Sequence, residues 1–255
     1  MSPAPGAGKS RIAIIAAMPG ELKPFLDSQA KEGWIHERSG SVHVWRLIWP
    51  LDQIEWVAAC AGAGQDAASR AFAAAEAAGP LSSVISVGWA GALSDACATG
   101  RAYAASGVID ARTGERYRPA LWSEERWLVT SPIVANEAEK QRLSATYSAA
   151  LVDMEAAAIA RLAGQRGIPF YCFKAVSDGF TDKLPDFNRF ISASGQFQTA
   201  GFVLFALLRP WLWPRLVRMG ENSRKAAAAL AACLLDFLDE RAYIRNRNGH
   251  PDSRR

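Results

Sequence analysis

The sequence predicts a single three-layer α/β domain, in which helices flank a mostly parallel, mixed β-sheet. Short apolar runs typical of strands alternate with longer alanine-rich or amphipathic runs typical of helices. The strand-like runs are apolar at nearly every position, which indicates strands buried on both faces. The chain has 255 residues, a length that one well-packed α/β domain accommodates without a second unit.

The expected elements follow from local composition. Strands are expected where short runs are rich in apolar residues, at 11–17, 43–49, 54–60, 83–88, 106–110, 127–131 and 169–176. Helices are expected over the longer runs 20–31, 65–78, 136–147, 154–165, 198–208 and 223–240. Glycine and proline at 79–80 and at 167–169 end two of these helices directly before a strand.

A single domain, large enough to contain an active site, is expected over residues 11–240. Residues 1–10 are rich in proline, glycine and alanine and are expected to form a disordered tail. Residues 241–255 are polar and charged and are expected to form a disordered basic tail. The net charge of +4 is concentrated near the C-terminus, since residues 209–255 carry ten basic and five acidic side chains. No basic stripe with interleaved aromatic residues accompanies a known motif, so nucleic-acid binding is not expected.

Cysteine spacing and hydropathy exclude several protein classes. The four cysteines lie far apart and form no CxxC motif; they are Cys60, Cys97, Cys172 and Cys233. We therefore expect reduced core thiols, no disulfide framework, no metal site and no cofactor. The apolar run 12–18 is short and ends at Pro19, which favours a first strand over a signal peptide. No run reaches the roughly 18 uncharged apolar residues of a membrane span, and a cytoplasmic protein is expected.

Acidic residues stand where predicted elements begin or end. Asp178 follows the last apolar strand, directly after Ser177, and Glu155 lies at the start of an alanine-rich helix, after Asp153 and Met154. A carboxylate at the end of a buried strand is costly to desolvate unless it has a partner or a function. Ligands of open α/β sheets bind outside the carboxyl ends of the strands. Asp178 is therefore the first candidate for a functional residue.

Two glycine-bearing segments follow neighbouring strands. Gly62 and Gly64 lie in a strand-to-helix turn, and residues 88–93, beginning at Gly88, are expected to form a second turn at the same edge of the sheet. Such turns let backbone N–H groups approach an anion or a ribose. Glu21 follows the first strand and begins a helix, where the helix dipole alone also favours an acid. Together these segments predict a pocket.

In chain order, these segments resemble the nucleoside phosphorylase superfamily, most of all its methylthioadenosine/S-adenosylhomocysteine nucleosidase branch. The similar segments are 14–21, 61–64, 88–93, 152–156 and 175–178. The resemblance extends from about residue 11 to residue 190. It implies a phosphorylase-like fold, a homodimer or larger assembly, and an enzyme that acts on a small-molecule nucleoside. The implied reaction is hydrolysis of the N-ribosidic bond to adenine.

The resemblance also implies roles for individual residues. Asp178 would be the general acid that protonates N7 of the purine, and Glu21 would position and deprotonate the attacking water. Glu155 would hydrogen-bond the ribose hydroxyls, with Met154 beneath the sugar. The remaining substrate-binding candidates are neighbours of these groups: Asp153, Ser177, Lys174, Gly62, Gly64 and Gly88. The chemistry is coherent, because cleavage builds positive charge on the sugar and negative charge on the leaving base.

Three features depart from the family pattern. Lys174 replaces the arginine usual on the last strand, and we expect it to pair with Asp178. Trp89 replaces a small hydroxyl residue in the second glycine segment. Residues 132–134 (Pro-Ile-Val) stand where a base-stacking aromatic is expected. These departures leave the substrate open while preserving the reaction class.

Three functions compete with the hydrolase. The first is a phosphate-dependent purine nucleoside phosphorylase, which is less favoured because Glu21 would repel phosphate. The second is an adenosyl-lipid (adenosylhopane) nucleosidase or phosphorylase of hopanoid synthesis, and the third is a non-catalytic nucleoside-binding protein. Residues 202–218 place tryptophans between arginines and prolines, a composition that suits peripheral membrane contact or a lipid-bearing ligand. Packing of this segment on the sheet or on a partner subunit explains the same composition.

Overall fold

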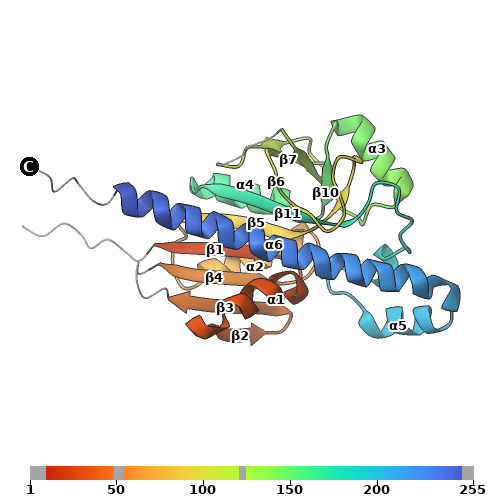
Figure 1. Ribbon diagram of the computed structural model, residues 1–255, viewed down its shortest axis with the longest axis horizontal. Coiled ribbons are helices and arrows are strands. Elements are labelled where there is room, and N and C mark those ends of the chain that lie inside the picture. The colour runs from red at the N-terminus through yellow and green to blue at the C-terminus, as the bar shows by residue number, and fades with distance from the viewer. Residues whose placement is uncertain (1–9, 49–53, 121–124, 249–255) are drawn as a thin grey trace, which may run out of the picture.

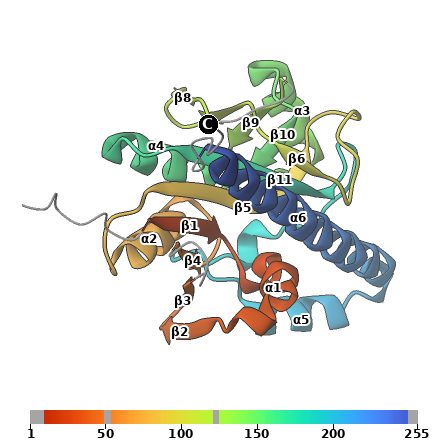
Figure 2. The ribbon, with the colours of Figure 1, turned by 60° about the vertical axis from the view of Figure 1, so that its left-hand side comes forward.

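A computed structural model of the chain shows a β-sheet with helices on both faces (Figures 1 and 2). The structure describes residues 10–48, 54–120 and 125–248. The three-layer arrangement confirms the predicted α/β class. Of the two predicted tails, residues 1–9 and 249–255 lie outside the described residues.

Within the described residues, eleven strands form one sheet. They are β1 (Arg11–Ala16), β2 (Ile35–Ser39), β3 (Val42–Ile48), β4 (Glu55–Cys60), β5 (Ser83–Ala92), β6 (Ala102–Ala104), β7 (Gly107–Asp110), β8 (Arg116–Tyr117), β9 (Trp127–Thr130), β10 (Leu151–Asp153) and β11 (Phe170–Asp178). The α-helices are α1 (Pro19–Ser28), α2 (Gln65–Glu76), α3 (Glu137–Tyr147), α4 (Ala156–Arg166), α5 (Thr199–Leu207) and α6 (Trp213–Asn248). Short 3-10 helices are η1 (Ala30–Glu32), η2 (Asn188–Phe190) and η3 (Pro210–Leu212).

The centre of the sheet is parallel. Strands β4, β1, β5 and β11 lie side by side in that order and run in one direction. Strand β9 is likewise parallel to β7 and β10. Antiparallel pairings join β2 to β3, β3 to β4, β6 to β11, β8 to β7, and β10 to the end of β5. Because the central strands share a direction, the segments after β1, β4, β5 and β11 emerge at the same edge.

Helices α1 and α6 pack on one face of the sheet, and α2 and α4 pack on the other (Figure 1). Successive residues of β1 alternate between these two layers: Ile14 joins the cluster that contains Phe237 of α6, and Ile15 joins the cluster that contains Phe72 of α2. The strand is therefore buried on both sides, as its continuous apolar run predicts. A third cluster, which includes Leu143, attaches α3 to β7 and β9.

The second glycine segment is not a turn, contrary to the prediction. Strand β5 continues through Gly88 to Ala92, and its ladder with β11 extends as far as Gly91. Glycine inside a strand often marks the close approach of another group. A Cβ at Gly88 would lie 2.8 Å from Oε1 of Glu21, so the glycine makes room for that carboxylate.

The boundaries of helices α4 and α6 also differ from the prediction. Helix α4 begins at Ala156 instead of residue 154, because Leu151–Asp153 form the short strand β10. Helix α6 begins at Trp213 instead of residue 223, since Pro214 lies in its first turn, where proline is tolerated. The same helix extends to Asn248, so residues 241–248 have a helical backbone where a disordered tail was predicted. Strands β2, β6, β8 and β10 were not predicted.

No single helix in the described ranges is long and apolar enough to cross a membrane. One bent pair, residues 199–207 with 210–239, meets the length and composition criteria only when the two helices are taken together, across a bend of 104°.

Candidate active site

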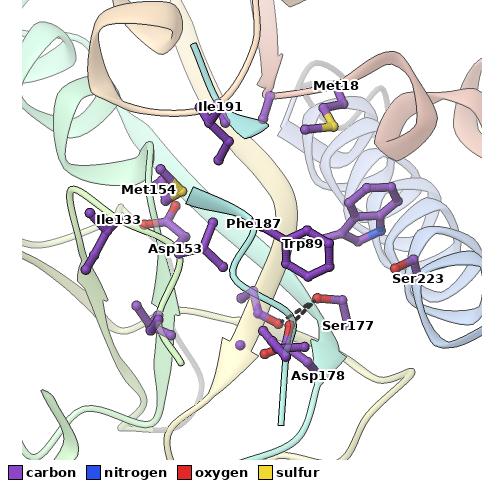
Figure 3. A pocket seen from close by; sticks show the side chains of 18 of the residues that line it. Met18, Trp89, Ile133, Asp153, Met154, Ser177, Asp178, Phe187, Ile191 and Ser223 are labelled. Carbon is purple, nitrogen blue, oxygen red and sulfur yellow. Dashed lines mark hydrogen bonds between the residues drawn. The ribbon is translucent and has the colours of Figure 1, made fainter. Parts of the chain in front are cut away.

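A cavity of about 340 Å³ lies at the sheet edge where the segments after β1, β5 and β11 emerge. Its polar lining comes from elements far apart in the sequence: Glu21, Lys140, Asp153, Glu155, Ser177, Asp178 and Ser223. In Figure 3, Ser177 and Asp178 lie at one end of the cavity and Met18 lies toward the other, with Trp89 between them. The cavity therefore brings together the three predicted segments that contain Glu21, Glu155 and Asp178.

Glu21 is held in place by the backbone. Its Oε2 accepts hydrogen bonds from the N–H groups of Ala17 and Met18, both at 2.8 Å, and its Oε1 accepts one from Trp89 at 2.7 Å. The side chain is buried. Burial raises the pKa of Glu21 above its ordinary value, against the opposing effect of these N–H donors. A fixed carboxylate with a raised pKa is a stronger base than an exposed one.

Glu155 joins the first glycine turn to the start of α4. Its Oε1 accepts a hydrogen bond of 2.7 Å from the backbone N–H of Gly64. Burial, and secondarily the neighbouring carboxylate of Asp153, raise the pKa of Glu155 to about 8. The raised pKa favours the protonated form of Glu155, which can both donate and accept a hydrogen bond.

Asp153 is anchored by three groups. Thr130 donates its hydroxyl to Oδ1 at 2.7 Å, and the backbone N–H of Ala156 donates to Oδ2 at 2.9 Å. The ammonium group of Lys174 lies 2.9 Å from Oδ2. Burial, the largest single effect, lowers the pKa of Lys174, but the carboxylate of Asp153, together with Cys172 and Glu155, raises it overall. This buried ion pair fixes β10 next to the cavity.

The expected pairing of Lys174 with Asp178 is wrong. Four residues of strand span about 13 Å, farther than a lysine side chain reaches, whereas Asp153 approaches Lys174 from another strand. Lys174 is fully buried and lies behind the cavity wall instead of lining the cavity.

Asp178 pairs with Lys140 of α3 instead. The ammonium group of Lys140 contacts Oδ2 of Asp178 and donates to the carbonyl of Gly179. On the other side, Ser177 donates its hydroxyl to Oδ1 at 2.7 Å (Figure 3). The register of β11 shifts between Val176 and Asp178, an irregularity that re-aims a side chain at the end of a strand. Asp178 is 14% exposed, so its carboxylate is accessible from the cavity, whereas the side chain of Lys140 is fully buried.

Gly91 on β5 leaves the space that this pair occupies. A Cβ at Gly91 would lie 2.9 Å from Oδ2 of Asp178 and 3.1 Å from Cε of Lys140. The predicted site did not include Lys140 or Gly91. The sequence held one signal for Lys140: it shares a helix face with Leu143 and Tyr147, at the i, i+3, i+7 spacing of an inward stripe.

The predicted site residues divide into two groups. Six line the cavity: Asp178, Glu21, Glu155, Met154, Asp153 and Ser177. The other four, Gly62, Gly64, Gly88 and Lys174, are not among its lining residues. Gly64 and Gly88 position the two glutamates, whereas Gly62 packs against the loop at Gly195.

Apolar side chains form the rest of the wall. On the lid-like segment after β11 and on α5 they are Leu184, Phe187, Ile191, Phe197 and Phe202. Ile133 and Val134 line the cavity at the segment where an aromatic residue was expected. Trp89 also faces the cavity, and its buried Nε1 has no hydrogen-bond partner among the described residues. A ligand with a large apolar part and a few polar groups fits this lining.

The described ranges contain no group of three or more His, Cys, Asp or Glu side chains that could hold a metal ion. The four cysteines are unpaired; Cys60, Cys97 and Cys172 are buried, as expected of core residues, and Cys233 is half-buried.

Comparisons with known proteins agree with this architecture. The family model of the phosphorylase superfamily matches residues 11–127 and 126–206. No curated protein matches the chain. Among solved structures, the 5′-methylthioadenosine/S-adenosylhomocysteine nucleosidase of Helicobacter pylori with butyl-thio-DADMe-Immucillin-A is similar, with a TM-score of 0.68 and 16% identity over 91% of this chain and 99% of that chain.

Two further solved structures share the fold. The futalosine hydrolase of Helicobacter pylori has a TM-score of 0.67 and 15% identity, over 91% of this chain and 98% of that chain. The apo 5′-methylthioadenosine nucleosidase of Arabidopsis thaliana has a TM-score of 0.67 and 16% identity, over 90% of this chain and 95% of that chain.

Proposed function

The chain belongs to the phosphorylase superfamily, and on that premise we propose that it is a purine nucleosidase that hydrolyses the N-ribosidic bond of an adenine nucleoside. The proposed substrates are of the methylthioadenosine/S-adenosylhomocysteine type, as in similar solved structures. One observation carries the proposal: Glu21, Glu155 and Asp178, from three separate segments, line a single cavity at the carboxyl edge of the sheet.

We assign to Asp178 the role of the general acid that protonates the leaving base. It combines an accessible carboxylate with hydrogen-bond support from Ser177. Cleavage leaves negative charge on the purine, and a proton delivered to its N7 neutralises that charge. Positioned acids of this kind typically contribute about 10²–10⁴-fold to the rate.

Lys140 is assigned as the positioning partner of Asp178. Lys140 can pass one proton to the carboxylate of Asp178, which delivers that proton to the purine, so that the step leaves a neutral amine and a carboxylate. The carbonyl of Gly179 holds the ammonium group in line for this transfer. Lys140 also orients the carboxyl group of Asp178. The flexible side chain of Lys140 is itself fixed by its contacts with Asp178 and with the carbonyl of Gly179.

We assign to Glu21 the role of the general base that positions and deprotonates the attacking water. Its two oxygens accept three backbone N–H groups, which fix the carboxylate but leave lone pairs for a further donor. Burial raises the pKa of Glu21, which favours its action as a general base near neutral pH. Water attack on the ribose carbon would transfer one water proton to this carboxylate.

We assign to Glu155 and Met154 the role of binding the ribose. Positive charge builds on the ribose as the bond to the base breaks. Glu155 lies between the turn at Gly64 and the cavity, where it can bind the ribose hydroxyls. Met154 supplies an apolar surface from the same segment.

Hydrolysis is favoured over phosphorolysis. A phosphate in the position of the nucleophile would meet the buried carboxylate of Glu21, and like charges repel strongly in a buried site. None of the described residues that line the cavity is an arginine, the side chain best suited to bind phosphate through two bonds.

A nucleoside with a lipid on its 5′ side is a second candidate substrate. The apolar wall that includes Phe187, Phe197 and Phe202 favours it, since this wall exceeds what a methylthio group can contact. An adenosyl lipid would place its chain against these rings.

The test is an adenine-release assay on the full chain, with methylthioadenosine, adenosylhomocysteine, inosine and an adenosyl lipid, each with and without phosphate. The proposal predicts release from an adenine nucleoside without phosphate. Release only with phosphate would identify a phosphorylase, and ligand binding without any release would identify a binding protein. Either result would refute the proposed hydrolase.

A further inference from the structure

Helix α5 is apolar on every side, yet none of its residues is buried. A helix that is apolar all round normally lies in a protein core or in a membrane. Its exposed side chains continue through η3 into α6, and we call them the α5 surface: Val203, Leu204, Leu207, Leu208, Trp211, Trp213 and Val217. Each is between 47% and 69% exposed. In the described part of the chain, the other exposed large apolar side chains are Ile35 and Ile133.

The α5 surface has a defined shape. The guanidinium of Arg209 lies 4.1 Å from the ring centre of Phe205, and Nε1 of Trp213 donates to the carbonyl of Ala206 at 2.9 Å. These contacts hold the bend between α5 and α6. In Figures 1 and 2, the N-terminal end of α6 extends beyond the sheet, with α5 beside it.

Helix α5 by itself is too short to span a membrane, and its length fits an interface. The nine residues of α5 measure about 14 Å along the helix axis, against a hydrocarbon core of about 30 Å. A short apolar helix followed by a sharp bend can instead lie within one face of a bilayer.

The positive charges in this segment favour a membrane with anionic headgroups. Residues 199–218 contain Arg209, Arg215 and Arg218 and no acidic residue. Arginines next to an apolar helix bind anionic headgroups, and tryptophans prefer the boundary between headgroups and acyl chains. Trp211 and Trp213 are both exposed and are close to these arginines in the sequence, while Arg215 and Arg218 also border a smaller cavity with Asp182.

We propose that the α5 surface, with Arg209, Arg215 and Arg218, docks on an anionic phospholipid membrane. The docking does not depend on the proposed reaction. The same helix also forms part of the cavity wall through Phe202, so the docked protein would present the apolar end of its cavity close to the lipid.

The test is co-sedimentation of the full chain with vesicles of phosphatidylcholine alone or of phosphatidylcholine with phosphatidylglycerol. We expect binding to the anionic vesicles that weakens as salt is added. The double variant Arg215→Gln/Arg218→Gln should bind them about thirtyfold more weakly. The double variant Trp211→Ser/Trp213→Ser should bind them weakly as well. Controls with the same chemistry elsewhere are Arg38→Gln and Ile35→Ser, which should bind like the unmodified chain.

The main rival is a second copy of the chain seated on the α5 surface. Sedimentation velocity without vesicles distinguishes the two, and circular dichroism verifies that each variant folds. If Trp211→Ser/Trp213→Ser converts a dimer to a monomer, the surface is a subunit interface and the proposal is overturned. Absent vesicle binding, or binding unchanged in both double variants, would also overturn it.

Discussion

The ammonium group of Lys140 contacts the carboxylate of Asp178, although the two residues come from separate elements, α3 and β11. Lys140 is completely buried, and a buried cation needs a partner to offset its desolvation. Asp178 is that partner and also faces the cavity. The end of the cavity assigned to the leaving base therefore contains a carboxylate and an ammonium in contact.

Replacing Lys140 tests this pair. We expect Lys140→Met to lower kcat about 10²-fold and to make kcat rise as the pH falls, because the proton must then come from solvent. The pH–rate profile separates this role from a purely structural one. The double variant Lys140→Met/Asp178→Asn should be no slower than Asp178→Asn alone, since both groups act in one step. Lys23→Met, which breaks an exposed ion pair with Asp27, is the matched control.

Gly91 tests the space around the same pair. A Cβ there would crowd Asp178 and Lys140, so Gly91→Ala should displace both groups and lower kcat/KM about 10²-fold. The matched control is Gly164→Ala in α4, where no atom lies within 4 Å of the added Cβ. Equal activity of the two variants would contradict the assigned geometry.

The Lys174–Asp153 pair makes a prediction about stability. Lys174→Met leaves a buried carboxylate without its cation and should destabilise the fold by about 3–5 kcal/mol in urea unfolding. Lys174→Met/Asp153→Asn should recover part of this loss. The exposed pair of Arg46 with Glu37 provides the control, because Arg46→Met should cost no more than about 1 kcal/mol.

Glu155 makes a prediction about pH. Its pKa is raised from 4.5 to about 8, so the folded chain retains a proton that the unfolded chain releases. The stability from this proton is complete below the unfolded pKa and is lost as the pH rises through about 8. The unfolding temperature should therefore fall more between pH 6 and pH 9 for the unmodified chain than for Glu155→Gln. Parallel curves would contradict the protonated state assigned to Glu155.

The sequence predicted the acids of the site better than it predicted their partners. Glu21 and Asp178 follow β1 and β11, which are both parallel to β5, and parallel strands bring such positions to one edge. Glu155 follows β10, which runs antiparallel to the end of β5, so its place in the cavity depends on that pairing. The convergence of Glu21 and Asp178 therefore follows from strand order. The partner of Asp178 does not, because Lys140 lies on a helix whose docking depends on the packing of Leu143 beneath it.

The errors in the fold have a similar origin. The glycines of residues 88–93 suggested a turn, but they serve to admit Glu21 and Asp178 against a continuous strand. Helix α6 begins earlier than predicted, because Pro214 lies in its first turn and Gly220 is tolerated within it. Local composition shows where small residues occur, but it does not show which distant side chains pack against them and require them to be small.

The most direct test of the central account is adenine release from methylthioadenosine in phosphate-free buffer, by the unmodified chain and by Asp178→Asn. We predict release by the unmodified chain, together with the free thiosugar. Release by Asp178→Asn should be at least about 10²-fold slower, with its fold verified by circular dichroism. Equal rates for the two proteins would contradict the role of Asp178 as the acid at the base.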